Sequence, residues 1–268
     1  MSPEVEEHLA AVEAYYRPLV VGEKARLAGG AALWRKFGQA VAAYRRHGRA
    51  KFRGVYEVIN EMAVANVLLT QDVSLVDAEI AYEPPIAQDG SRIDFVVERP
   101  AVGTLYVEVK TVHPSMEDSD ANWAKYLARR ERHTPHTHYI VAKDALGAAL
   151  YGDAFATRSK FMEYTLEFER RLVEARKRRQ GESALVFCGT GVKWHRDALE
   201  DFADFYETGR HRADDAFGVM EAAWIADEGI ELRRNIDRLG LFFRDMDHVT
   251  ARVWSAAVRG PRFAGAFL

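Results

Sequence analysis

Asp94, Glu108 and Lys110 have side chains whose types and spacing could support metal-assisted chemistry. The first two carry carboxylates, and Lys110 carries an ammonium group two residues after Glu108. Two carboxylates that are brought together repel each other unless a cation lies between them. Lys110 is one candidate cation, and a divalent metal ion is the better one, because hard cations prefer carboxylate oxygens.

Two β-rich segments carry these residues and are joined by a loop that contains Pro100 and Gly103. Proline and glycine between two such segments predict a β-hairpin over residues 91–110. With the loop centred on Ala101, Asp94 lies opposite Glu108. Side chains alternate between the faces of a strand, and cross-strand partners share a face. One face then carries Asp94, Val96, Tyr106, Glu108 and Lys110, and the other carries Ile93, Phe95, Val97, Leu105, Val107 and Val109.

The polar face of this hairpin has a simpler interpretation, which is a solvent-facing surface with a cross-strand ion pair. Val96 and Tyr106 lie on the same face and favour a covered surface. A covered pair of carboxylates needs a compensating charge. The sequence therefore favours a site over a solvated surface.

The hairpin resembles the core of the PD-(D/E)XK nuclease superfamily, which has the restriction-endonuclease-like fold. The family pattern places an Asp on one strand and a Glu-x-Lys on the next, here Asp94 and Glu108-Val109-Lys110. Ile93 stands where the family often has proline. The resemblance covers residues 52–190, and its context of helix, strand, hairpin and helix adds to the weight of the three residues.

The resemblance implies a metal site and a catalytic role for each of these residues. Asp94, Glu108 and the backbone carbonyl of Val109 would bind Mg²⁺ or Mn²⁺. Lys110 would hold the attacking water or neutralise the developing charge.

The family's preceding helix often supplies a further Glu, which takes a second ion or a metal-bound water. Glu57 and Glu61 are four residues apart and share one helix face. Glu61 fits the role better, because small and apolar residues follow it, as they do in the family. Glu57 is one turn away and remains open.

The function implied by the resemblance is that of a metal-dependent nuclease that hydrolyses phosphodiester bonds, with DNA favoured as the substrate and RNA left open. The alternative is a catalytically inactive nucleic-acid-binding or assembly protein that retains the fold. A third interpretation is coincidence in an unrelated α/β protein. Intact Asp94, Glu108 and Lys110 favour the nuclease over the inactive protein, because a decayed site would usually lose one of them.

The net charge of −3 hides a basic segment over residues 21–53, where nine Lys or Arg stand against one Glu. Such a segment fits a phosphate backbone, although a solvated helix face is an equal alternative. The expected nucleic-acid contacts are Arg45, Arg46, Arg49, Lys51 and Arg53, joined by Trp123 and Lys125 after the hairpin, where Trp123 could stack on a base.

Hydrophobic periodicity predicts helices over 4–47 (two helices, with Gly29-Gly30 kinking the second), 54–70, 121–132, 154–179 and 195–207. Strands are predicted over 79–83, in the hairpin, over 138–142, 184–187 and 217–225, and in a second hairpin over 239–244 and 249–254, with a loop over 113–120.

This element order predicts an α/β (α+β mixed) fold with a restriction-endonuclease-like core, in which helices flank a central mixed sheet. The domains predicted are an N-terminal helical region at 1–51, the nuclease core at 52–190 and a C-terminal α/β extension at 191–268.

Composition limits the class of protein. Apolar residues make up 48% of the 268 residues and charged residues 29%, which is typical of a globular chain. No apolar run reaches the roughly 18 residues of a membrane helix, and the acidic N-terminus does not resemble a signal peptide. The single cysteine, Cys188, excludes an internal disulfide and follows an apolar run typical of a core strand. We expect a cytoplasmic protein with no membrane partner, and a homodimer remains open.

Three histidines, His133, His136 and His138, form the next candidate metal cluster. They could bind Zn²⁺ together with a carboxylate. No strong fourth ligand accompanies them, so a loop of surface histidines is the favoured interpretation.

Overall fold

The computed structural model describes residues 3–22, 25–71, 77–86, 90–100, 102–112, 140–143, 149–152, 154–190, 195–210, 226, 229 and 231–244. Its helices are α1 (Pro3–Val21), α2 (Gly30–His47), α3 (Phe52–Asn66), α5 (Ala154–Arg178) and α6 (His195–Thr208). A 3₁₀ turn (Gly48–Lys51) joins α2 to α3, and a π-helical turn (Val67–Gln71) follows α3. The strands are β1 (Leu27–Ala28), β2 (Glu79–Tyr82), β3 (Phe95–Arg99), β4 (Gly103–Val112), β5 (Ile140–Lys143), β6 (Ala149–Gly152), β7 (Gly181–Thr190) and β8 (Arg238–Arg244).

A six-stranded mixed sheet forms the centre, in the order β1-β2-β3-β4-β7-β8. Strands β2, β3 and β4 are antiparallel to one another, while β4, β7 and β8 run parallel, as do β1 and β2. Strands β5 and β6 form a separate antiparallel pair. The α/β class with a mixed sheet flanked by helices is therefore confirmed.

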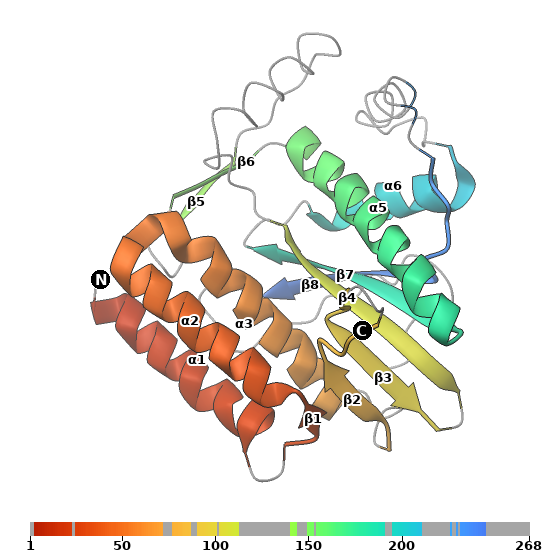
Figure 1. Cartoon of the computed structure of the whole chain (residues 1–268). Coiled ribbons are helices and arrows are strands. Elements are labelled where there is room, and N and C mark those ends of the chain that lie inside the picture. The colour runs from red at the N-terminus through yellow and green to blue at the C-terminus, as the bar shows by residue number, and fades with distance from the viewer. Residues whose placement is uncertain are drawn as a thin grey trace.

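Helices cover both faces of this sheet (Figure 1). Side chains of α1, α2 and α3 share a core with alternate residues of β3, β4 and β7, such as Phe95, Val107 and Val186. The intervening residues, such as Leu185 and Phe187, pack with α5 and α6. This alternation follows from the two-residue period of strands, and it gives three layers with a core on each side of the sheet. None of the described helices is long and apolar enough to cross a membrane.

The hairpin register is confirmed within the ladder of β3 and β4: Phe95 pairs with Val107 and Arg99 with Gly103. Two details were wrong. The ladder begins at Phe95, so Asp94 lies immediately before the strand and is not paired with Glu108 within it. Ile93 packs with the α5 and α6 core rather than with the core of Phe95. The chain bends at Asp94, immediately before β3 begins, so strand alternation does not extend back to Ile93.

Several element boundaries also differ from the prediction. Gly29 does not kink a helix but precedes one: its backbone is left-handed (φ 82°) at the start of α2. Glycine suits this position, since a Cβ there would lie 2.7 Å from the carbonyl oxygen of Tyr82. Strand β7 extends beyond the predicted 184–187 on both sides. The loop at 113–120, the helix at 121–132 and the strands at 217–225 and 249–254 lie outside the described residues.

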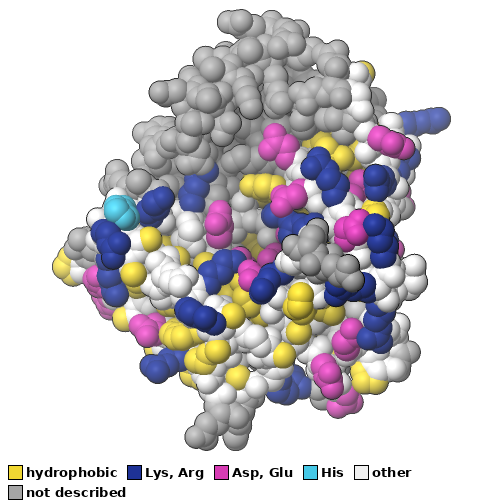
Figure 2. Space-filling view, in the orientation of Figure 1, with side chains coloured by type: hydrophobic (Ala, Val, Ile, Leu, Met, Phe, Trp, Pro, Cys, Tyr) yellow, Lys and Arg dark blue, Asp and Glu magenta, His cyan; other side chains and the backbone are white. Residues whose placement is uncertain are grey.

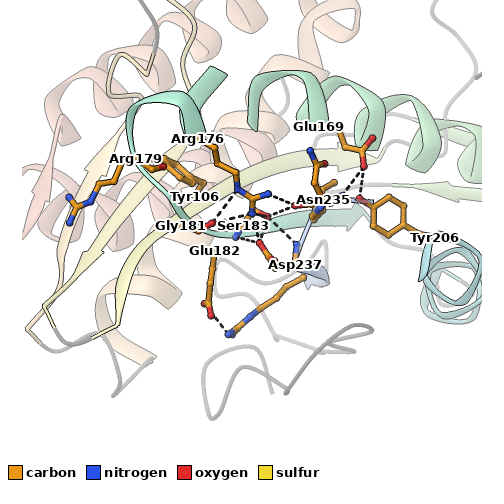
Figure 3. Close-up of polar contacts among 12 residues, drawn as sticks. Tyr106, Glu169, Arg176, Arg179, Gly181, Glu182, Ser183, Tyr206, Asn235 and Asp237 are labelled. Carbon is orange, nitrogen blue, oxygen red and sulfur yellow. Dashed lines mark hydrogen bonds and ion pairs between the residues drawn. The ribbon is translucent and has the colours of Figure 1, made fainter. Parts of the chain in front are cut away.

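A polar network fastens β8 and α6 to the rest of the molecule (Figure 3). The guanidinium of Arg176 in α5 lies 2.6 Å from Oδ2 of Asp237, which also accepts hydrogen bonds from the amide and hydroxyl of Ser183 in β7. Nearby, the Tyr206 hydroxyl of α6 donates to the buried Glu169 carboxylate at 2.6 Å. The Arg176–Asp237 pair joins α5 to the segment that leads into β8, and the Tyr206–Glu169 hydrogen bond joins α6 to α5. This network therefore stabilises the edge of the sheet.

Candidate functional site

Asp94 occupies the place where strand β3 would continue beside β4. Its Oδ2 accepts a hydrogen bond of 2.7 Å from the backbone amide of Val109. The amide and carbonyl of one strand residue point to the same side of the strand. The carbonyl of Val109 therefore points to the side of β4 on which Asp94 lies. Burial raises the pKa of Asp94, although the Val109 hydrogen bond and the Lys110 charge oppose this.

Glu108 is the most deeply buried acid of the site, with 1% of its side chain exposed. Its Oε1 contacts Lys110 Nζ at 3.1 Å and Arg171 Nη2 at 2.5 Å. Its Oε2 is buried and has no hydrogen-bond partner among the residues that the structure describes. Burial and the charge of Asp94 raise the pKa of Glu108 to about 8, against the opposing effect of Lys110 and Arg171. A buried carboxylate oxygen without a donor is costly, so this atom is a ready acceptor for a cation.

Lys110 is held between β4 and α5. Besides Glu108, its Nζ contacts Glu167 Oε2 at 3.2 Å and lies 5.5 Å from the ring centroid of Tyr164. Glu167 also pairs with Arg171 at 2.6 Å, four residues later on the same helix. The ammonium of Lys110 is therefore fixed close to the buried Glu108 carboxylate, and 18% of the Lys110 side chain remains exposed.

Glu61 approaches this group from α3, on the other side of the sheet. Lys36 Nζ lies 3.0 Å from both of its carboxylate oxygens, and the Tyr82 hydroxyl donates to Oε2 at 2.6 Å. Burial and the charge of Asp94 raise the pKa of Glu61 to about 7, although Lys36 and Tyr82 lower it. Glu57, one turn earlier, is exposed, whereas Glu61 is buried.

Asp94, Glu108 and Lys110 thus meet at β4, and Glu61 is linked to them through the charge of Asp94, which raises the pKa of Glu61. Asp94 is common to both halves, because its charge acts on Glu108 and on Glu61. Among the residues that the structure describes, no three His, Cys, Asp or Glu side chains are grouped as ligands of one metal ion. An ion here would rest on the Asp94 and Glu108 carboxylates, which suits Mg²⁺, because it is usually held by one or two carboxylates and keeps several waters.

The expected nucleic-acid contacts differ in exposure and in charge pairing. Arg45 is paired with Glu6 of α1 at 2.7 Å, so its charge is already partly balanced. Arg46 and Lys51 are exposed, and Arg53 is half-buried. On the face shown in Figure 2, basic side chains are interspersed with acidic ones rather than gathered in one patch. The side chain of Arg49, together with Trp123, Lys125 and the three histidines, lies outside the described residues.

Five residues of the site were missed by the sequence reasoning. Lys36 was counted only as one charge of the basic segment, and Tyr82 and Glu83 only as part of a strand. Glu167 and Arg171 stand four residues apart on α5, which is the spacing of a helical ion pair. That spacing was the available signal for these two.

No protein-family model, curated protein or solved structure matches the chain. The function therefore has to be inferred from the geometry of the site itself.

Proposed function

We propose that the protein is a metal-dependent nuclease with a restriction-endonuclease-like core, and that it hydrolyses phosphodiester bonds in DNA. The observation that carries the proposal is the buried Oε2 of Glu108, which lacks a hydrogen-bond partner within the described part of the chain and lies close to the Asp94 charge and to Lys110. A folded protein has little reason to keep two buried acids together unless a cation compensates them in the working state.

The architecture supports the proposal. The elements α3, β2, β3, β4, α5 and β7 follow the order that the sequence predicted for the nuclease core, and β4 and β7 are parallel neighbours. Glu108 and Lys110 belong to β4 at the centre of the sheet, and Asp94, at the bend before β3, is held against β4 by the hydrogen bond from the amide of Val109.

Each residue has a role that follows from its contacts. Asp94 and Glu108 would hold Mg²⁺ or Mn²⁺, with the carbonyl of Val109 as a further oxygen ligand. When bound, the ion would polarise a phosphoryl oxygen and acidify a water. Lys110, held by Glu108 and Glu167, places a compact positive charge where negative charge develops on the phosphate. Arg171 adds a planar guanidinium that can bind a phosphate in two places.

The direct test is cleavage of DNA by the purified chain. We expect cleavage with Mg²⁺ or Mn²⁺ and none with EDTA. Ca²⁺ should bind without supporting cleavage, because it holds its ligands loosely and acidifies water poorly. A wild-type protein that cleaves neither DNA nor RNA would contradict the proposal and leave the inactive nucleic-acid-binding protein in front.

Two variants separate metal binding from the chemical step. Asp94→Ala removes a ligand, so metal affinity and rate should both fall. Lys110→Ala keeps both acids, so the protein should still bind the ion in a calorimetric titration while cleavage falls at least about 100-fold. The controls are Glu98→Gln, which changes an acid on the strand that follows Asp94, and Lys177→Ala, which removes a lysine at the far end of α5. Both controls should behave as wild type, and full activity of Lys110→Ala would show that the residues are misassigned.

A further inference from the structure

The ammonium of Lys36 is surrounded by oxygen atoms in the way that a bound cation would be. Its Nζ lies 3.0 Å from both carboxylate oxygens of Glu61, 3.0 Å from the Tyr82 hydroxyl and 3.1 Å from Oε1 of Glu83. These oxygens come from α3, from β2 and from the residue that follows β2. Lys36 itself reaches them from α2, in the N-terminal helical region.

The backbone at Glu83 is shaped for this contact. Glu83 has a left-handed backbone (φ 44°), which is uncommon for a residue other than glycine. The amide of Glu83 donates to the carbonyl of Asp94 at 2.8 Å, and the Arg92 guanidinium donates to the carbonyl of Glu83 at 3.1 Å. Strained backbone of this kind persists where the surroundings hold it and is concentrated at functional sites. Here it sets the Glu83 carboxylate against Lys36.

Hydrogen bonds join this oxygen cluster to the proposed metal position through Asp94. The amide of Glu83 donates to the Asp94 carbonyl at 2.8 Å, and Asp94 Oδ2 accepts from the amide of Val109, the residue after Glu108, at 2.7 Å. The charge of Asp94 also raises the pKa values of Glu108 and Glu61. Enzymes that hydrolyse phosphodiesters with two metal ions place the ions a few ångströms apart, with carboxylates around both. In this chain the carboxylates around the second position already hold a positive charge.

We infer that the Lys36 ammonium fills the second cation position of the candidate active site, so that the chain binds one divalent ion and not two. The inference rests on the proposed function. A tethered ammonium is present at a high effective concentration, which a free ion at millimolar levels has to overcome. The charge of Lys36 agrees with this inference. Burial alone would lower the pKa of Lys36, but Glu61 and Glu83 raise it above its ordinary value. The ammonium therefore keeps its positive charge. Lys36 is thus a positioning residue, because its ammonium holds the Glu61 carboxylate as a metal ion would.

The test is the number of Mn²⁺ ions bound per chain, measured by calorimetry and by the loss of the free-ion signal in electron paramagnetic resonance. Wild type should bind one ion. Lys36→Met should bind two, because it leaves Glu61 and Glu83 without their cation. Lys36→Gln keeps a hydrogen-bond donor and should also bind two, which covers the case in which the methionine variant does not fold. The matched control Lys177→Met changes a surface lysine of α5 and should bind one.

A double variant, Lys36→Gln with Glu61→Gln, should return the count to one, because the second position then lacks its main acid. A count of two in wild type overturns the inference without any variant and leaves the nuclease proposal intact. A count of one in both folded Lys36 variants also overturns it. A count of zero in wild type removes the metal site and the inference together, and this outcome is distinct from the other two.

Discussion

Replacing Glu108 with glutamine should stabilise the metal-free protein while abolishing its response to metal. A carboxyl whose pKa rises from 4.5 to about 8 on folding is harder to ionise in the folded chain. At pH 8 this difference costs the folded state on the order of 4 kcal/mol. Glutamine removes that cost but also loses the ion pairs with Lys110 and Arg171, so we expect a net gain of about 1–3 kcal/mol. For a chain of this size the gain corresponds to a rise in Tm of roughly 3–10 °C.

The sign of the pH dependence makes this prediction specific. The pKa of Glu108 is higher in the folded state than in the unfolded state. The contribution of Glu108 to the stability of the wild-type protein is therefore favourable at low pH and is lost as pH rises from about 4.5 towards 8. The advantage of Glu108→Gln should therefore be small at pH 5 and should grow up to pH 8.

Thermal unfolding in EDTA at several pH values measures this advantage. Addition of Mn²⁺ should raise the Tm of wild type and not that of the variant. The control Glu98→Gln, at a partly exposed acid of β3, should show neither effect. A variant less stable than wild type at pH 8, or an advantage independent of pH, would refute the reasoning.

Two further predictions concern binding and stability. Arg46→Glu should weaken DNA binding and reduce the slope of log affinity against log salt by about 1, if this exposed residue of α2 contacts a phosphate; an unchanged slope, measured by fluorescence anisotropy, would assign it to a solvated face. Tyr206→Phe should cost about 1–3 kcal/mol, because the buried Glu169 carboxylate and the amide of Ile236 each lose a hydrogen bond. Chemical denaturation measures this loss, and Mn²⁺ binding should be unchanged in the variant.

The hairpin could be predicted from the sequence because its determinants are local. A short loop with proline and glycine fixes which residues face each other, and the pairing of Phe95 with Val107 follows from it. The helix over 154–179 was equally accessible, since its apolar residues recur at helical spacing and the structure has it at Ala154–Arg178. Strand β7 was predicted too short, because glycine, serine and threonine at its ends carry no hydrophobic pattern. The first of these ends is extended because it pairs with β4, and the second because β4 and β8 lie on either side of it.

Lys110 was predicted from the sequence, but Lys36 and Arg171 were not, because they reach the acids from elements distant in sequence. Lys36 meets Glu61 across 25 residues, and Arg171 meets Glu108 across 63. Periodicity identifies the apolar stripe of a helix, but it does not say which charged residue beside that stripe will reach a neighbouring layer. A long side chain at the edge of the stripe can extend in several directions, and tertiary packing selects one of them.

Lys36 also changes how the N-terminal helices relate to the site. From the sequence, residues 1–51 were predicted to be an addition to a core that begins at residue 52. In the structure, α1 and α2 share one hydrophobic core with α3 and the sheet. Lys36 then joins α2 to α3 through Glu61 and to the end of β2 through Tyr82 and Glu83. Replacement of Lys36 by an apolar residue would leave the buried Glu61 carboxylate without its nearest cation, which is a costly state for a carboxylate. The electrostatic balance of the candidate site therefore depends on α2 as much as on the strands that carry its acids.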